Sequence, residues 1–258
     1  MKFENTEVYG FKRALKGMRN PLESWRKNDT VEENGKVVIG ENDLDLAQRL
    51  IKSGSEHRKF MRQSFVSVDI TGPLYWWKEF DTYKVGTVAN SCSTMHKIQE
   101  KEFTLEDFSC EHLISDWIGD NNDAIWYKDP PKNGLIKCPI IFSPLDALRI
   151  TIGVLNTNRE AYLKTKDKKF WWQMIQLLPS SYNQTRNVMM NYEVLTNIYK
   201  SRKDHKLDEW REFCKWIESL PYSELIIGET QFPLSPLLVK EKTDNSRGTG
   251  LWQPGDTD

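Results

Sequence analysis

The sequence LPSSYNQTRNVMMNYEVLTNIYKSR, residues 178–202, carries polar side chains at positions where an ordinary helix would be apolar. Pro179 and the two serines that follow it are typical of a helix start, and no helix breaker occurs between Gln184 and Arg202. The pattern therefore predicts a helix that runs from about Gln184 to Arg202.

One row of that helix would contain Asn191, Leu195, Ile198 and Arg202. At about 100° and 1.5 Å per residue, the two ends of the row differ in direction by roughly 20° and are roughly 16 Å apart. Such a face can hold a flat ring system on its apolar residues and bind polar edges with the amide and the guanidinium. The alternative is an amphipathic helix whose Asn191 and Arg202 lie at the solvated margin.

An earlier segment predicts a strand followed by a helix. Apolar and polar residues alternate from Ser64 to Ile70, which indicates a half-buried strand. Pro73 favours the start of a helix, and Trp76, Phe80 and Tyr83 then recur at the spacing of one buried helix face.

A small polar segment, Asn-Ser-Cys-Ser-Thr at positions 90–94, follows that helix. Hydroxyls and backbone N–H groups in such a segment can bind a phosphate oxygen. The alternative is an ordinary polar turn. A reactive thiol is not predicted at Cys92, because nothing in the sequence indicates a lowered pKa there.

Together these segments resemble the flavin-dependent thymidylate synthases. The C-terminal part of the resemblance is carried by Leu178-Pro179, Asn191, Leu195, Asn197 and Arg202. The earlier part is carried by His57, the strand 64–70, Pro73, Thr82-Tyr83-Lys84 and Cys92. The last two elements keep the spacing of the family's Arg-His-Arg-x7-Ser motif but not its residue types.

The resemblance implies reductive methylation of deoxyuridine monophosphate (dUMP) to thymidine monophosphate (dTMP), with FAD as cofactor and NADPH and methylenetetrahydrofolate as co-substrates. It implies that the nucleotide is bound by Glu79, Asn90, Ser91, Cys92, Ser93, Thr94 and Arg202. It implies that the flavin is bound by His57, Thr82, Tyr83, Lys84, Asn191 and Asn197. It also implies a homotetramer with sites at subunit junctions. No catalytic residue is assigned.

The departures from the family pattern concern positive charge. Lys84 keeps one charge at the altered motif but lacks the fork of a guanidinium. Ile175 replaces an Arg that commonly binds phosphate in the family, so another cation must take its place. The candidates are Arg19, Arg26, Arg58, Arg62 and Arg186.

These departures leave two alternatives open. The first is a diverged homologue that binds a nucleotide or flavin but modifies another pyrimidine nucleotide or is inactive. The second is a structural or interaction protein whose aromatic surface docks another chain.

Composition narrows the class of protein further. The chain has 258 residues, a formal net charge of −1 and 38% hydrophobic residues, which indicates a globular protein and argues against nucleic acid as the main partner. No apolar run approaches the ~20 residues of a membrane span and no signal peptide is recognisable, so we expect a cytoplasmic protein without membrane contact. The cysteines and histidines lack metal-site spacing, so no metal is predicted.

The predicted fold class is α+β, with a small antiparallel or mixed sheet flanked by several helices. We expect one domain over residues 1–239, with an N-terminal arm at 1–41 and an enlarged helical and loop segment at 100–168. A helix is predicted to open at Ser143-Pro144, and Thr104 with Asp107 resembles a capping box at the start of another. Residues 240–258 are expected to form a mobile tail.

Overall fold

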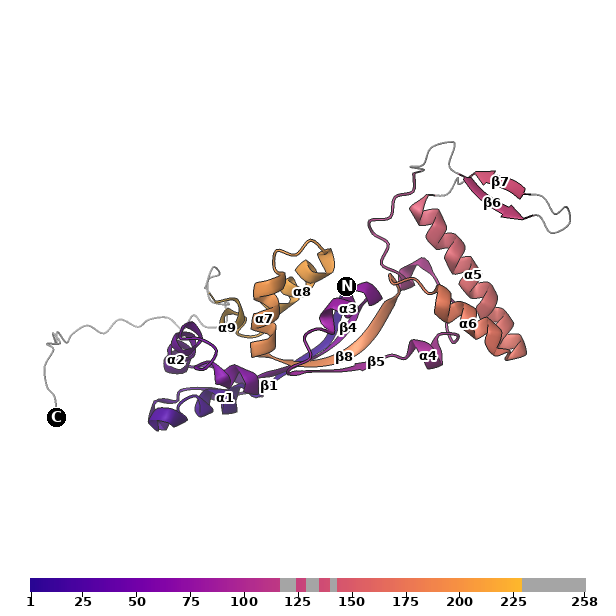
Figure 1. The fold of residues 1–258 in the computed structure, drawn as a ribbon. Coiled ribbons are helices and arrows are strands. Elements are labelled where there is room, and N and C mark those ends of the chain that lie inside the picture. The colour runs from indigo at the N-terminus through magenta and orange to yellow at the C-terminus, as the bar shows by residue number, and fades with distance from the viewer. Residues whose placement is uncertain (117–123, 129–134, 140–142, 229–258) are drawn as a thin grey trace, which may run out of the picture. The chain divides into compact units, whose positions relative to one another are not determined.

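The computed structural model describes residues 1–116, 124–128, 135–139 and 143–228. A four-stranded antiparallel sheet in the order β1-β4-β8-β5 lies at its centre (Figure 1). Its strands are β1 (Lys2–Tyr9), β4 (Phe65–Pro73), β8 (Asn183–Asn191) and β5 (Thr87–Ser91). Two small hairpins join β2 (Val31–Glu33) to β3 (Lys36–Val38) and β6 (Ala124–Lys128) to β7 (Leu135–Pro139). The expected α+β class with a small antiparallel sheet is confirmed.

The helices come from both ends and the middle of the chain. They are α1 (Phe11–Gly17), α2 (Glu41–Lys52), α3 (Leu74–Phe80), α4 (Thr94–Lys97), α5 (Pro144–Thr165), α6 (Lys168–Leu177), α7 (Tyr192–Arg202), α8 (Asp208–Glu218) and α9 (Glu224–Ile227). Short 3-10 turns occur at Asn20–Leu22, Trp25–Lys27, Lys59–Gln63 and Leu105–Asp107.

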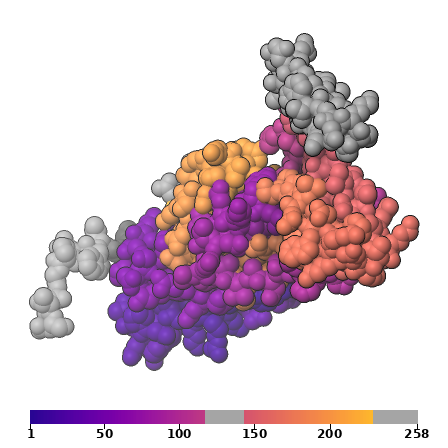
Figure 2. All heavy atoms as spheres, turned by 45° about the vertical axis from the view of Figure 1, so that its right-hand side comes forward, coloured from indigo at the N-terminus to yellow at the C-terminus, as the bar shows by residue number. Residues whose placement is uncertain are grey.

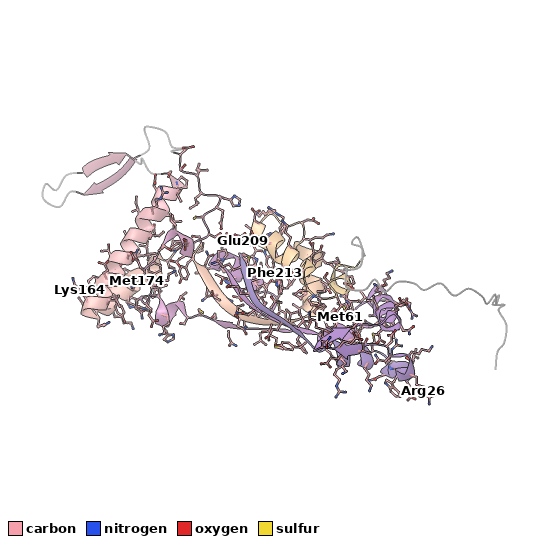
Figure 3. The ribbon with its side chains drawn as sticks, turned by 180° about the vertical axis from the view of Figure 1, so that it is seen from behind. Arg26, Met61, Lys164, Met174, Glu209 and Phe213 are labelled. Atoms are coloured by element: carbon pink, nitrogen blue, oxygen red, sulfur yellow. The ribbon has the colours of Figure 1, made fainter. Side chains whose placement is uncertain are left out.

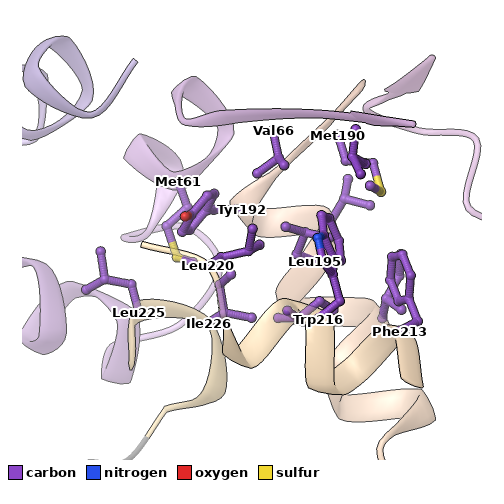
Figure 4. Packing of buried hydrophobic residues seen from close by; sticks show 14 of the residues in the cluster. Met61, Val66, Met190, Tyr192, Leu195, Phe213, Trp216, Leu220, Leu225 and Ile226 are labelled. Atoms are coloured by element: carbon purple, nitrogen blue, oxygen red, sulfur yellow. The ribbon is translucent and has the colours of Figure 1, made fainter. Parts of the chain in front are cut away.

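The main hydrophobic core lies between one face of the sheet and the helices α1, α3, α7 and α8. Val66, Val68 and Ile70 are fully buried on β4, as the alternating pattern predicted. They meet aromatic and aliphatic side chains of the helices, including Leu195, Phe213 and Trp216 (Figure 4). The core also takes Phe11, Ala14 and Leu15 from α1, so the first residues of the expected arm belong to the same packing unit, Met1–Gly228.

The predicted helix from Gln184 to Arg202 is wrong in its first half. Residues 183–191 form β8, which hydrogen-bonds to β4 on one side and to β5 on the other. Gln184, Val188 and Met190 are buried at the period of a strand, so tertiary pairing on both edges outweighs the absence of a helix breaker. The helix α7 begins only at Tyr192, where Asn191 Oδ1 accepts a hydrogen bond of 2.9 Å from the Val194 N–H.

A second, smaller core holds the predicted middle segment together. Leu148, Ile152 and Leu155 of α5 and Met174 of α6 pack with residues between Ile98 and Phe108 (Figure 3). The predicted start of α5 is confirmed, because Ser143 caps it by accepting the Asp146 N–H. The capping box at Thr104 and Asp107 also forms, but it opens a single 3-10 turn and not the longer helix we expected.

The opposite face of the sheet presents exposed side chains. Val88 on β5 is 65% exposed, and Met189 beside it on β8 is 40% exposed. Asp69 lies further along this face and accepts hydrogen bonds of 2.8 Å from Asn5 and Asn187. These two bonds hold the pKa of Asp69 below its usual value.

Two expected absences concern only the described ranges. Within them no helix has the length and apolar character needed to cross a bilayer. No group of three or more His, Cys, Asp and Glu side chains suited to a metal occurs in those same ranges. The predicted tail at 240–258 and the domain boundary at 239 lie outside the described residues.

Candidate functional site

Arg202 at the end of α7 is the centre of a polar cluster. Its Nη1 donates to Glu79 Oε2 at 2.9 Å, and its Nε donates to the Tyr83 hydroxyl at 2.8 Å. Trp210 of α8 donates from Nε1 to the same Glu79 oxygen at 2.9 Å. The structure therefore brings three predicted site residues, Glu79, Tyr83 and Arg202, into direct contact.

Aromatic rings fix the position of this guanidinium. The Arg202 Cζ lies 4.6 Å from the centre of the Trp210 ring and 5.6 Å from the centre of the Tyr83 ring. His205 Nε2 approaches Glu79 Oε2 at 3.7 Å. The Arg202 side chain stays 20% exposed, so it is partly accessible to solvent.

A second cluster surrounds Arg58, which follows the predicted flavin residue His57. Arg58 forms an ion pair with Glu193, with Nε 2.8 Å from Oε2 and Nη2 donating to Oε1 at 3.0 Å. Arg58 Nη2 also donates to Asn197 Oδ1 at 3.4 Å. Both charged side chains are 10% exposed, whereas His57 is exposed. The sequence analysis thus predicted the exposed His57 as a flavin residue and not the adjacent, buried Arg58.

The predicted ligand-binding row on α7 is wrong. Leu195 and Ile198 are fully buried in the main core, so they cannot present a surface to a flat ring. Asn191 is the N-cap of the helix and not part of its body. The amphipathic alternative holds for α7, because its apolar residues are buried in the main core and its exposed residues, Asn197, Lys200 and Ser201, are polar.

The segment 90–94 is divided between a strand and a pocket. Asn90 and Ser91 lie in β5, opposite Asn187 and Arg186, so the alternative of an ordinary polar turn does not hold for these two residues. Cys92, Ser93 and Thr94 line a cavity of about 310 Å³. The Ser93 hydroxyl accepts from the His96 N–H and caps α4.

Lysines surround this pocket, and sequence reasoning missed them. Lys97, Lys101 and Lys2 contribute to its lining, together with Tyr182 and Asp107. Lys97 and Lys101 could have been noticed, because they follow Cys92 in the sequence by only five and nine residues. Lys2 reaches the pocket only because β1 pairs with β4 and places it opposite Thr71, which no local signal reveals.

The charges of the pocket are partly balanced. Lys101 Nζ lies 2.7 Å from Asp107 Oδ1, and the hydrogen bond that Lys101 donates to this carboxylate raises the pKa of Lys101. Burial acts to raise the pKa of Asp107, but hydrogen bonds from Lys101 and Thr104 outweigh it and hold that pKa below its usual value. Lys97 is paired with Glu100 on the surface.

The candidate arginines are mostly committed elsewhere. Arg19 pairs with Asp43 in the interior at 2.6 Å, and Arg58 pairs with Glu193. Arg186 pairs with Asp81 at 2.7 Å and stacks on the Trp77 ring. Arg26 and Arg62 are exposed, and neither lines the cavity.

Arg186 and Gln184 connect the pocket with the end of α3. Gln184 Nε2 donates to the Cys92 carbonyl at 2.8 Å, and its Oε1 accepts from Arg186 Nε at 3.0 Å. Arg186 then reaches Asp81, which immediately follows α3. These hydrogen bonds therefore connect the pocket to the residue that follows α3, the helix that carries Glu79.

The remaining predicted residues lie near the end of α3. Thr82 donates its hydroxyl hydrogen to the Glu79 carbonyl at 2.7 Å. Lys84 is exposed. Gly86 has a positive φ of 79°, and a Cβ there would lie 2.9 Å from Asn191 Nδ2. The turn after α3 therefore packs closely against the N-terminus of α7.

Comparison with known proteins identifies the class of fold. The sequence matches no protein-family model and no curated protein. The structure is similar to flavin-dependent thymidylate synthase ThyX from Helicobacter pylori complexed with FAD and dUMP, with a TM-score of 0.56 and 15% identity over 89% of this chain and 98% of that chain. A second structure of the same enzyme with FAD and dUMP gives a TM-score of 0.57 at 15% identity, with the same coverage of both chains.

A more distant likeness is to the UMP/dUMP methylase PolB from Streptomyces cacaoi bound with 5-Br dUMP, with a TM-score of 0.48 and 12% identity over 84% of this chain and 88% of that chain. The likeness to the two ThyX structures shows that the chain has the α+β fold of the flavin-dependent thymidylate synthases along most of its length.

Proposed function

We propose that this chain is a nucleotide-modifying enzyme of the flavin-dependent thymidylate synthase type. Its reaction would be the reductive methylation of dUMP to dTMP with methylenetetrahydrofolate, FAD and NADPH. The observation that carries this proposal is the contact of Arg202 with Glu79 and Tyr83, residues 123 and 119 positions away that the sequence resemblance had assigned to one site. The shared fold supports the same conclusion.

The pocket at Cys92–Thr94 supports binding of the nucleotide phosphate. Three lysines against the carboxylates of Glu106 and Asp107 leave one formal positive charge in its lining, which suits a phosphate. Thr94 contributes a hydroxyl, and Tyr182 contributes a ring beside which a pyrimidine can lie. The proposed phosphate cations are therefore Lys97, Lys101 and Lys2, in place of the family arginine.

The donor groups of this chain fit a flavin. The oxygen of Asn197 accepts a hydrogen bond inside the chain, which leaves the amide N–H groups of this exposed residue to donate. Lys84 and His57 are exposed and can donate to the carbonyl oxygens of a flavin or pair with its negative charge. When bound, the flavin would supply the hydride that completes the methyl group.

The proposed site needs a second wall. Of the predicted flavin residues, His57, Thr82, Lys84 and Asn197 are exposed and Asn191 is buried, and none of the six lines the cavity at Cys92. We expect another copy of the chain to supply that wall, in a homotetramer whose sites lie at subunit junctions. Loss of assembly should then abolish flavin binding.

Absorption spectroscopy of the purified protein tests the flavin. We expect a yellow protein whose flavin bands bleach when NADPH is added. A colourless protein that does not take up added FAD would contradict the proposal. Rescue of a thymidine-requiring bacterium then tests whether the product is dTMP.

Titration with dUMP tests the phosphate pocket. Lys97→Gln with Lys101→Gln should weaken binding by about tenfold, which corresponds to ~1.4 kcal/mol. Lys36→Gln with Lys52→Gln removes the same charge from exposed positions away from the pocket and should leave the affinity unchanged. Unchanged affinity after Ser91→Ala with Ser93→Ala would exclude a role of those hydroxyls.

The pairing of Arg202 with Glu79 favours a second candidate. A carboxylate already neutralises this guanidinium, and Lys84 alone remains of the charge at the altered motif. The second candidate is a diverged homologue that binds nucleotide and flavin but modifies another pyrimidine nucleotide. Flavin binding without bacterial rescue would identify it.

A further inference from the structure

The turn between α5 and α6 carries a local surplus of positive charge. Four exposed lysines lie there: Lys164, Lys166, Lys168 and Lys169. Asp167 is the one acidic residue in the sequence segment 162–172, which therefore has a formal charge of +3. Because the whole chain has a net charge of −1, the other residues together sum to −4. The near-neutral total is thus compatible with a strongly basic surface segment, here called the basic turn and defined as residues 162–172.

Hydrogen bonds fix the shape of this basic turn. The Thr165 hydroxyl donates to the Ala161 carbonyl at 2.8 Å and accepts from the Asp167 N–H at 3.1 Å. Asp167 then caps α6 by accepting from the Lys169 N–H at 3.0 Å. Only Lys166 and Asp167 separate the two helices. The lysines therefore project from a preorganised scaffold and not from a long loop.

Aromatic and aliphatic side chains lie among these lysines. Trp172 is 44% exposed and Leu163 is 38% exposed. The Lys168 ammonium lies 5.8 Å from the centres of the Trp171 and Trp172 rings. In the space-filling view of Figure 2, α5 and α6 form a continuous part of the surface, and Figure 3 labels Lys164 near the outer end of α5. The basic turn thus presents ammonium groups beside apolar groups at one end of the helix pair.

We propose that the basic turn docks on the surface of a membrane that contains anionic lipids. Lysines are attracted to the negative headgroups, and indole rings favour the boundary between headgroups and acyl chains. An exposed apolar side chain such as Leu163 is stabilised when it enters that boundary. This mode of contact differs from a spanning segment or a signal peptide, whose absence from the sequence led us to expect no membrane contact.

Single-stranded nucleic acid is the other polyanion that lysines and aromatic rings bind. A stacked strand needs rings that lie parallel to its bases. The Trp171 and Trp172 rings are 4.9 Å apart and inclined at 72°, so they do not form a platform for successive bases. Leu163 contributes neither to base stacking nor to phosphate binding. The geometry therefore favours a lipid surface, and this assignment holds or fails independently of the proposed nucleotide and flavin chemistry.

Vesicle co-sedimentation of the full chain tests the proposal. We expect the protein to pellet with vesicles made of phosphatidylcholine and phosphatidylserine in equal parts, and to stay in the supernatant with phosphatidylcholine alone. Lys164→Gln with Lys168→Gln should lower the vesicle affinity by about twenty-five-fold, because each lysine at an anionic surface contributes about fivefold. Lys36→Gln with Lys52→Gln removes the same charge from exposed positions elsewhere and should leave the affinity unchanged.

Trp172 gives a second test that does not depend on charge. Trp172→Ser should lower the vesicle affinity by about fivefold, because less apolar surface enters the membrane boundary. Trp25→Ser, at a side chain that is also 44% exposed, is the matched control and should leave the affinity unchanged. All four variants should keep the melting temperature of the wild type in circular dichroism, since the altered side chains lie at the surface.

Three outcomes would overturn the proposal. The first is a wild type that does not pellet with the anionic vesicles. The second is equal vesicle affinity of the Lys164→Gln, Lys168→Gln variant and its lysine control. The third is binding of a short oligothymidine by the wild type without binding of the vesicles, which would identify nucleic acid as the occupant of the basic turn.

Discussion

The guanidinium of Arg202 and the carboxylate of Glu79 are joined at 2.9 Å although 123 positions separate them in the chain. The pair is partly exposed, with 20% of the Arg202 side chain and 38% of the Glu79 side chain accessible. An exposed ion pair of this kind contributes roughly 0–1 kcal/mol to the free energy of unfolding. We therefore expect the position of the Arg202 guanidinium to matter more for ligand binding than for folding.

Replacing Arg202 should therefore separate binding from stability. We expect Arg202→Gln to weaken dUMP binding by about tenfold or more, measured by calorimetric titration, and to change the free energy of unfolding by less than about 1 kcal/mol. Arg211→Gln removes another exposed guanidinium, which pairs with Asp208 within α8, and serves as the control. Equal losses of affinity in the two variants would argue against a specific role of Arg202.

The ion pair of Arg58 and Glu193 should behave in the opposite way. Removal of one partner from a buried pair leaves an uncompensated charge and typically costs about 3–5 kcal/mol. We expect Glu193→Ala to lower the free energy of unfolding by about that amount in urea denaturation. Asp45→Ala breaks an exposed pair with Arg49, in which both side chains are 66% accessible, and should cost less than about 1 kcal/mol. A similar loss in the two variants would contradict the structural role of Arg58.

Gly86 is a further sensitive position. Its φ is +79°, and an added Cβ would lie 2.9 Å from Asn191 Nδ2 and 3.0 Å from Val194 Cγ2. Gly35 has a similar φ of +75° but nothing within 4 Å, so Gly35→Ala reports the backbone strain alone. We expect Gly86→Ala to be more destabilising than Gly35→Ala by about 1–3 kcal/mol and also to weaken flavin binding. Equal melting temperatures of the two variants would count against this packing.

The free energy of unfolding should depend on pH through the carboxyl group of Asp107. Its pKa lies below its usual value of 3.8, because hydrogen bonds from Lys101 and Thr104 outweigh the effect of burial. The carboxylate therefore stabilises the fold at pH values above the unfolded pKa, and this contribution is lost as the pH falls through the lowered folded pKa. Wild type and Asp107→Asn should differ in free energy of unfolding at neutral pH and converge in strong acid. A difference that does not change with pH would disprove the assignment.

Local periodicity was sufficient to predict much of this fold. The alternation around Val66, the aromatic spacing from Trp76 to Phe80 and the cap at Ser143 each reflect contacts that a single element makes with the core or with itself. Such patterns can be recognised in a single sequence because each of them involves only residues that are close together in the chain.

The wrong prediction of a helix at β8 shows what local periodicity cannot reveal. Asn187 and Met189 face the open side of the sheet, and the strand exists because β4 and β5 supply partners on both edges. Its residues alone do not distinguish it from the helix that follows. The same limit applies to Leu195 and Ile198, whose apolar character fits a ligand face and a core equally well until their burial is known.

The sequence by itself was sufficient to predict the class of fold and to single out Glu79, Tyr83 and Arg202 as candidate ligand-binding residues. Only the tertiary structure decided which atoms of that site are already engaged and that Lys2 reaches the pocket at Cys92. The physical reason is that hydrogen bonds and ion pairs between distant segments depend on strand register and helix packing, and a one-dimensional pattern constrains these weakly.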